Sequence, residues 1–202
     1  MPALKFLESW LLKEPQDLDV LQVLILTRRG GVEVDKIVEI LVNVESKSPN
    51  RFIYSALIDL YFEKFDQKKV LSYCKKLFDL TTDSELKSKI LFQTAYVHYV
   101  AGNQEKVEKI LQTALKYEPV YPSTYNLLAY LYAQNNKKLP EALEKIELAL
   151  KVRPDCYYYM DTKGYVLLKM GKSAEAKVLF EQASKLNPDD QEVLKHLKLA
   201  QE

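Results

Sequence analysis

Prolines recur along this chain of 202 residues at a nearly constant interval. The series consists of Pro15, Pro49, Pro119, Pro154 and Pro188. Successive members are 34, 70, 35 and 34 residues apart, and the spacing of 70 corresponds to two intervals. An interval of this size is typical of stacked helical hairpins, in which each unit buries its apolar face against its neighbours. Because such a stack leaves one long face free, the pattern favours binding over catalysis.

Small and apolar residues follow the same interval. Before each of the last three prolines, the chain has a small residue in a first helix and both small and large residues in a second. These sets are Ala95, Val107, Leu111 and Ala114; Ala129, Ala142, Ile146 and Ala149; and Gly164, Ala176, Phe180 and Ala183. A small residue opposite a large one lets two helices approach closely. Gly102, the pair Asn135 and Asn136, and Gly171 lie between the two helices and predict a left-handed residue at each turn. Looser versions of the pattern carry Ile58 with Cys74 and Ile25 with Leu41.

These residues resemble the tetratricopeptide repeat, most clearly between Lys87 and Pro188, although the tryptophan of that motif is absent. The resemblance implies an all-α fold, a right-handed superhelical solenoid of antiparallel helix pairs forming one elongated domain. The predicted units are an N-terminal half repeat at 2–14, five repeats at 18–51, 52–86, 87–121, 122–155 and 156–190, and a capping helix at 191–202. Because the chain begins halfway through a unit, we expect it to be a piece of a longer solenoid.

Composition narrows the classes of partner. The 29 basic and 28 acidic residues give a net charge of +1, so no overall field attracts nucleic acid or an anionic membrane. No run approaches the ~18 apolar residues needed for a transmembrane helix, which predicts no membrane insertion. Cys74 and Cys156 lie more than two units apart in the expected stack, too far for a disulfide. Two free thiols predict a reducing, cytoplasmic location.

Ingredients for catalysis are sparse. The chain has only two histidines, and no cysteine or histidine pair has metal-ligand spacing. We expect His98 to be a buried, hydrogen-bonded packing residue and His196 to lie on the surface. Gly30 and Gly31 lack the strand and the third glycine of a dinucleotide site, and they are expected to end a helix. The sequence therefore predicts a protein that is not an enzyme and uses no cofactor or metal.

Tyrosine is the informative residue type, since the chain has 14 of them. Tyrosine offers a large apolar area, few rotatable bonds and a polar tip, which suit a binding groove. In the register of the resemblance, the partner-binding residues on the inner face are Phe92, Tyr96, Tyr99, Asn126, Tyr130, Tyr158, Asp161, Tyr165 and Lys169. The Asn126 amide could bond a peptide backbone, and Asp161 with Lys169 could contact a charged group. The alternative, that individual tyrosines are core residues between helices, stays open.

A well-known subclass of the family binds the C-terminal carboxylate of chaperones with basic and amide side chains. Of that set only Lys89 is present here, so this role is disfavoured.

We predict a non-catalytic scaffold that binds a peptide or helix of a partner protein in a tyrosine-rich concave groove. A recognition or oligomerisation arm of a larger protein, by self-association or by fusion to further domains, is the alternative. Recognition of RNA is disfavoured, because Asp59 and Glu63 add acidic groups to the expected lining.

Overall fold

The computed structural model describes residues 2–201 and, within them, consists of helices without any strand. The helices are α1 (Pro2–Leu11), α2 (Leu18–Leu26), the short 3-10 helix η1 (Thr27–Gly30), α3 (Val34–Lys47), α4 (Arg51–Glu63), α5 (Gln67–Leu80), α6 (Ser84–Val100), α7 (Gln104–Ala114), α8 (Pro122–Gln134), α9 (Leu139–Val152), α10 (Tyr157–Lys169), α11 (Ser173–Leu186) and α12 (Gln191–Leu199).

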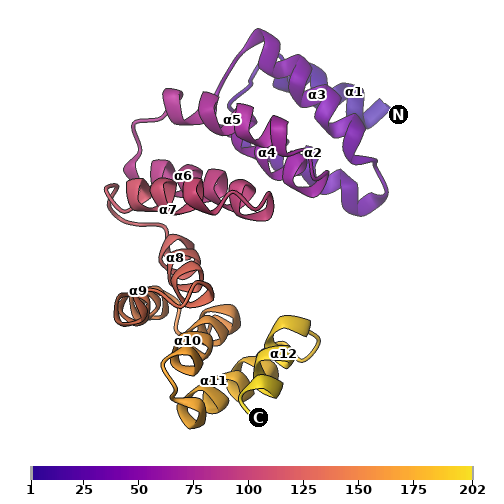
Figure 1. The fold of residues 1–202 in the computed structure, drawn as a ribbon. Helices are drawn as coiled ribbons and strands as arrows, with labels where there is room; N and C mark the ends of the chain where they lie inside the picture. The colour runs from indigo at the N-terminus through magenta and orange to yellow at the C-terminus, as the bar shows by residue number, and fades with distance from the viewer. Residues whose placement is uncertain (1, 202) are drawn as a thin grey trace.

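Neighbouring helices pair and the pairs stack in chain order. The pairs α4 with α5, α6 with α7, α8 with α9 and α10 with α11 are closely packed, and each second helix also contacts the first helix of the next pair. Figure 1 shows the stack as an arc, with the two chain ends far apart, α9 on its outer side and α8 further in. The arrangement confirms the predicted all-α superhelical solenoid of antiparallel helix pairs.

Helix ends follow the residues that the sequence supplies. α3, α9 and α11 end at Lys47, Val152 and Leu186, each two residues before a proline. Proline has no backbone donor and clashes with the preceding turn, so a helix stops ahead of it. Five helices begin with an aspartate or asparagine whose side chain accepts a backbone N–H, and these caps are Asp17, Asn50, Asp66, Asp83 and Asp190.

The turn inside each hairpin needs one residue in the left-handed region. Gly102, Asn136 and Gly171 have φ of 77°, 50° and 78°, which confirms their predicted role. The equivalent residue between α4 and α5 is Phe65, with φ of 55°. A non-glycine side chain in this conformation costs ~1–2 kcal/mol because its Cβ crowds the backbone, so this turn is more strained than the turns that have glycine at this place.

Close approach within a pair depends on complementary volumes. Gly164 on α10 faces Phe180 on α11. Ala95 on α6 and Ala129 on α8 occupy the equivalent places in their helix pairs, and they share a buried cluster with Leu111 and Ile146 on the second helices. In the pair α4 and α5 the large and small residues have changed places. The large residue, Ile58, is on the first helix, and the smaller one, Cys74, is on the second. The first pair has Ile25 and Leu41 at these two places, and α2 packs mainly on α1 with few contacts to α3.

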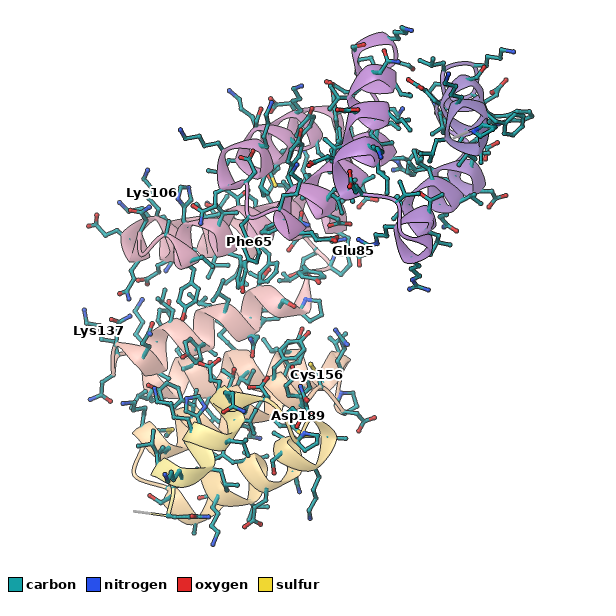
Figure 2. All side chains as sticks on the ribbon, turned by 90° about the vertical axis from the view of Figure 1, so that its right-hand side faces the viewer. Phe65, Glu85, Lys106, Lys137, Cys156 and Asp189 are labelled. Atoms are coloured by element: carbon teal, nitrogen blue, oxygen red, sulfur yellow. The ribbon has the colours of Figure 1, made fainter. Side chains whose placement is uncertain are left out.

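The hydrophobic core is distributed along the stack in three clusters. Side chains fill the space between successive helices throughout the arc (Figure 2). Both cysteines are free, as predicted, and both are buried. His98 is only half-buried, and its side chain has no hydrogen bond to residues 2–201, which corrects the hydrogen-bonded role expected for it. Burial, and to a smaller extent the charge of Lys106, lower the pKa of His98.

No helix among residues 2–201 is both long and apolar enough to span a bilayer.

The requirement for a small residue opposite a large one within a helix pair can be tested at Gly164. A Cβ added there would lie 2.6 Å from Cε1 of Phe180, whose side chain is fully buried and cannot move aside. We expect Gly164→Ala to lower the free energy of unfolding by about 1–2 kcal/mol, although alanine is the better helix former, because overpacking costs ~1–3 kcal/mol. Urea denaturation followed by circular dichroism measures the change. Adding Phe180→Leu should recover part of the loss, and a more stable single variant would contradict this requirement.

Candidate functional site

Aromatic rings form a continuous series across successive first helices. Tyr96, Tyr130 and Tyr165 occupy the same place in α6, α8 and α10. The Tyr130 and Tyr165 rings stack directly, whereas Tyr99 lies between Tyr96 and Tyr130. Neighbouring ring centroids in the series are 4.6 to 6.4 Å apart. This aromatic ladder consists of Phe62, Tyr96, Tyr99, Tyr130, Tyr165 and His196. Rings at these separations attract one another beyond the apolar area that they bury.

A cavity of about 180 Å³ opens beside the ladder. We call it the tyrosine groove, and its lining residues come from α6, α8, α10 and α12: Tyr96, Tyr99, Asn126, Leu127, Tyr130, Tyr158, Asp161, Thr162 and Glu192. Six of the nine predicted site residues are among them. The other three adjoin it, since Phe92 stacks on Tyr96 at 6.1 Å and Tyr165 stacks on Tyr130 at 5.4 Å, with Lys169 Nζ 5.2 Å from the Tyr165 ring centroid.

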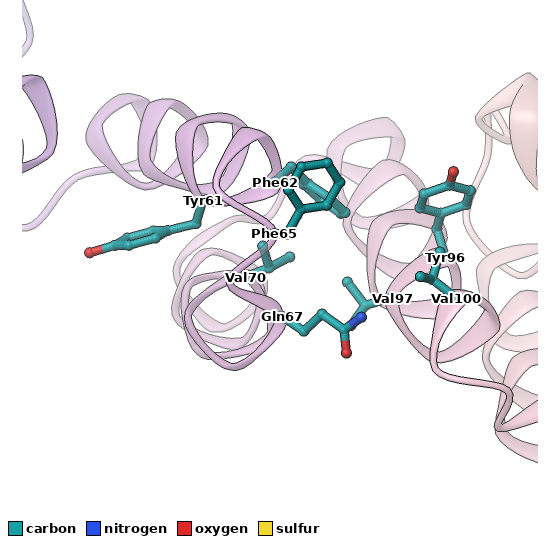
Figure 3. Close-up of a pocket in the computed structure, with 8 residues that line it drawn as sticks. All are labelled: Tyr61, Phe62, Phe65, Gln67, Val70, Tyr96, Val97 and Val100. Atoms are coloured by element: carbon teal, nitrogen blue, oxygen red, sulfur yellow. The ribbon is translucent and has the colours of Figure 1, made fainter. Parts of the chain in front are cut away.

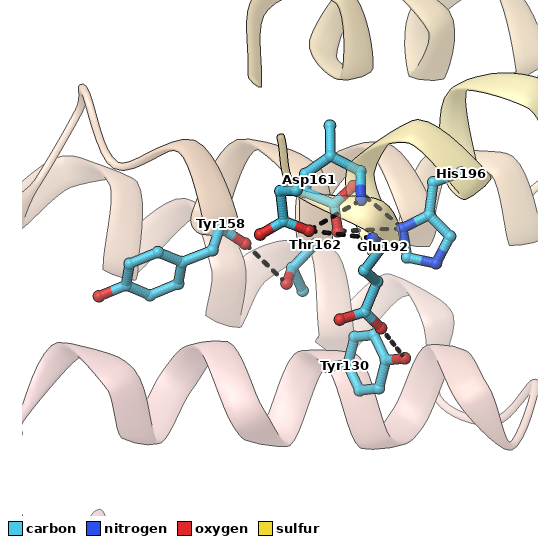
Figure 4. Close-up of polar contacts among 8 residues, drawn as sticks. Tyr130, Tyr158, Asp161, Thr162, Glu192 and His196 are labelled. Atoms are coloured by element: carbon cyan, nitrogen blue, oxygen red, sulfur yellow. Dashed lines mark hydrogen bonds and ion pairs between the residues drawn. The ribbon is translucent and has the colours of Figure 1, made fainter. Parts of the chain in front are cut away.

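Polar atoms converge at the end of the groove formed by α12 (Figure 4). The Tyr130 hydroxyl donates to Oε1 of Glu192 at 2.7 Å. Burial, followed by the hydrogen bond and charge of Glu192, raises the pKa of Tyr130, which keeps the phenol protonated. Oδ1 of Asn126 is shielded from solvent and accepts no hydrogen bond from the described residues. An amide acceptor buried without a donor is costly.

A buried acid and imidazole lie beneath the groove. Nδ1 of His196 is 2.9 Å and 3.0 Å from the two carboxylate oxygens of Asp161, and the residues are 4% and 5% exposed. The surface position predicted for His196 is therefore wrong. Its ring stacks on Tyr165 at 4.6 Å. Burial raises the pKa of Asp161, and the hydrogen bond from His196 opposes that rise. Asp161 faces α12 rather than forming the solvent-facing pair with Lys169 that the sequence suggested.

A second, apolar hollow continues from the groove toward the N-terminus (Figure 3). Its volume is about 280 Å³, and it is lined by Tyr61, Phe62, Phe65, Gln67, Val70, Tyr96, Val97 and Val100. Tyr96 lines both cavities and so connects them. Phe65 is 89% exposed, although it also adopts the strained backbone described above. The apolar hollow thus presents large apolar side chains to solvent next to the tyrosine groove.

Sequence reasoning missed the contributions of α12 and of Phe65. Extending the repeat by one more unit from Tyr158 and Asp161 would have found Glu192 and His196, because α12 occupies the place of another first helix. Phe65 could have been found from the turn register, in which glycine or asparagine stands at the other turns. Leu127 and Thr162 carried no separate signal.

The fold and the ladder define the chain as a superhelical repeat protein with its polar and aromatic residues gathered on first helices. Residues 157–190 match the family model described as tetratricopeptide repeat. The chain thus contains a match to this repeat and is similar to proteins built from it, in line with its sequence resemblance. A curated relative, the TPR repeat-containing protein PA4667 of Pseudomonas aeruginosa, is 34% identical over 92 residues, which is 46% of this chain and 15% of that protein. The chain thus spans about 15% of the length of this relative.

Solved structures share the fold at low identity. The APC/C heterotetramer Cut9–Hcn1 aligns over 98% of this chain and 39% of that one, with a TM-score of 0.74 and 14% identity. YrrB, described as a TPR protein with an unusual peptide-binding site, aligns over 95% of this chain and 97% of its own, with a TM-score of 0.61 and 13% identity. At these identities the likeness establishes the arrangement of helices.

The Asp161–His196 pair predicts a strong dependence of α12 on one imidazole. His196→Ala leaves the Asp161 carboxylate buried without its partner, so we expect the free energy of unfolding to fall by about 3 kcal/mol. Urea denaturation, with hydrogen exchange to localise the loss at α12, measures this. The double variant Asp161→Asn with His196→Ala should recover part of the loss, since a neutral amide is easier to bury. An unchanged stability in His196→Ala would show that the pair does not hold α12.

Proposed function

We propose that the chain is a non-catalytic interaction scaffold that binds an extended segment or a helix of a partner protein along the tyrosine groove. The observation that carries this proposal is the continuity of the aromatic ladder over several helix pairs. A ladder of half-buried tyrosines offers apolar contact area with few rotatable bonds to immobilise, and its hydroxyls can bond a polypeptide. The absence of catalytic activity remains a prediction.

The Asn126 amide supports a polypeptide as the ligand. Its Oδ1 accepts no hydrogen bond from residues 2–201, and an unsatisfied buried acceptor costs ~1–3 kcal/mol. A backbone N–H of a bound segment is a donor that every polypeptide carries at regular spacing. Binding of a peptide can therefore satisfy an atom that the fold itself leaves unpaired.

The apolar hollow supports a ligand longer than the tyrosine groove alone. Because Tyr96 connects the two cavities, a segment that lies on the ladder can place an apolar side chain beside Phe65 and Val100. Large exposed apolar residues grouped beside a polar groove are typical of protein-binding surfaces. The peptide-binding site of YrrB, a protein of the same fold, is consistent with a peptide as the ligand.

A recognition or oligomerisation arm of a larger protein is the second candidate. The curated relative is far longer than the chain, which favours a repeat segment attached to other domains. The groove would then serve the same binding role inside a longer molecule. RNA is a poorer candidate, because the groove is lined by Asp161 and Glu192 and by no lysine or arginine.

Removing two tyrosine side chains of the aromatic ladder tests whether the groove is the binding surface. The immobilised chain is used to capture proteins from a native lysate, and the most enriched protein is purified for direct binding measurements. We expect Tyr96→Ala with Tyr130→Ala to weaken its affinity about 30-fold, as for loss of hot-spot aromatics worth ~2 kcal/mol. Isothermal titration calorimetry measures this, and circular dichroism confirms that the variant is folded.

A matched control removes exposed apolar side chains elsewhere. Leu148 on α9 and Val178 on α11 are 42% and 52% exposed, and neither helix contributes to the groove. Changing both to alanine should leave the affinity unchanged. If the tyrosine variant and the control bind equally, or if the tyrosine variant binds like the wild type, the groove is not the binding surface.

Phe65 allows binding and stability to be separated. Asparagine is the residue at the same place in the turn between α8 and α9, and it tolerates a left-handed backbone better than phenylalanine. We expect Phe65→Asn to raise the free energy of unfolding by about 1 kcal/mol, while the affinity for the captured partner falls several-fold. Urea denaturation and calorimetry on the same samples give the two values. A loss of stability would mean that Phe65 is a folding residue, and an unchanged affinity would exclude the apolar hollow from the binding surface.

A further inference from the structure

We propose that the tyrosine groove receives a cationic side chain, lysine or arginine, from the bound segment. The proposal rests on the proposed function, and it adds the chemistry that the partner must carry. It follows from three features of the groove: its carboxylates, which have no lysine or arginine beside them in the lining, its aromatic faces and its size.

The lining has acidic groups and no cationic one. Glu192 and Asp161 both line the groove, and the remaining lining residues are four tyrosines, an asparagine, a leucine and a threonine. Oε1 of Glu192 accepts from Tyr130, whereas Oε2 accepts no hydrogen bond from residues 2–201. Glu192 lies in the first turn of α12 and is exposed, so a ligand can reach this oxygen.

Asp161 adds negative charge in a site that water reaches poorly. Its neighbour is an imidazole, His196, rather than a lysine or an arginine. Burial raises the pKa of Asp161, the hydrogen bond and charge of His196 lower it, and the negative charges of Glu192 and Asp190 raise it again. Negative charge is thus concentrated where it is poorly solvated, and a cation placed among these groups relieves that cost.

Aromatic faces supply the second attraction. A cation within ~6 Å of a ring centroid gains ~0.5–2 kcal/mol from the ring quadrupole, and more as water is excluded. The chain already uses one rung of the ladder in this way, because Lys169 Nζ lies 5.2 Å from the centroid of Tyr165. Tyr130, stacked on Tyr165, is the next rung and lines the groove, as do Tyr96, Tyr99 and Tyr158.

The size of the groove fits the end of one side chain. Its volume of about 180 Å³ is below the ~300–1,000 Å³ typical of small-molecule sites. The groove also differs in charge from a site for carboxylates. Lys89, the residue that such a site would have used, lines a separate cavity between α4 and α6 together with Asp83 and Glu85.

A selection from random dodecamer peptides displayed on phage, with the full chain as bait, tests the inference while the natural partner is unidentified. We expect peptides that bind the wild type and not Tyr96→Ala with Tyr130→Ala to share a lysine or arginine at one position. Replacing that residue by glutamine should weaken binding about tenfold. Glu192→Gln should weaken the basic peptide several-fold and leave the glutamine peptide unaffected, because the two changes remove the same interaction.

The control variant is Glu144→Gln, on the exposed side of α9, which removes the same charge away from the groove. It should bind the basic peptide like the wild type. Equal losses in Glu192→Gln and Glu144→Gln would show a general electrostatic effect and overturn the inference. Groove-dependent peptides without a shared basic residue would overturn it while leaving the proposed function intact. A selection that yields no groove-dependent peptide would overturn both.

Discussion

The close approach of the two helices in each pair is the interaction on which the rest of the structure depends. Gly164 gives Phe180 the space that a methyl group would occupy, and small residues on α6 and α8 do the same for Leu111 and Ile146. The requirement concerns summed volume rather than a fixed residue, since Ile58 and Cys74 satisfy it with the large member on the other helix. In the first pair, α2 and α3, both residues at these places are large, namely Ile25 and Leu41, and α2 packs on α1 instead of α3.

The binding surface follows from that packing. Once the pairs stack at a regular interval, residues at one place in successive first helices must lie next to one another. Tyrosine at that place in α6, α8 and α10, together with Tyr99 between the first two, then becomes a row of rings in contact. The same geometry brings Glu192 over Tyr130, although they are far apart in the sequence. The groove therefore needs no loop to shape it, and its rigidity comes from the core behind it.

Much of this could be predicted from sequence, because a repeat constrains many positions at once. Proline spacing and the small and large residues predicted the helix pairs and their turns, and the register identified the residues that gather at the groove. The burial of His196 could not be predicted from α12 alone, since a polar residue on a terminal helix reads as solvent-facing until its partner Asp161 is placed beside it. Phe65 was missed because the pattern reports which residue suits a turn, and here the residue present does not suit it.

Three departures from good local structure lie on one face of the molecule. The buried acceptor of Asn126, the poorly solvated Asp161 and the left-handed, exposed Phe65 all lie in or beside the two connected cavities. By contrast, the buried positions between the paired helices are filled by well-packed apolar side chains. An unpaired acceptor and backbone strain are costs that contacts with a ligand can offset. They support the tyrosine groove and the apolar hollow as the binding surface.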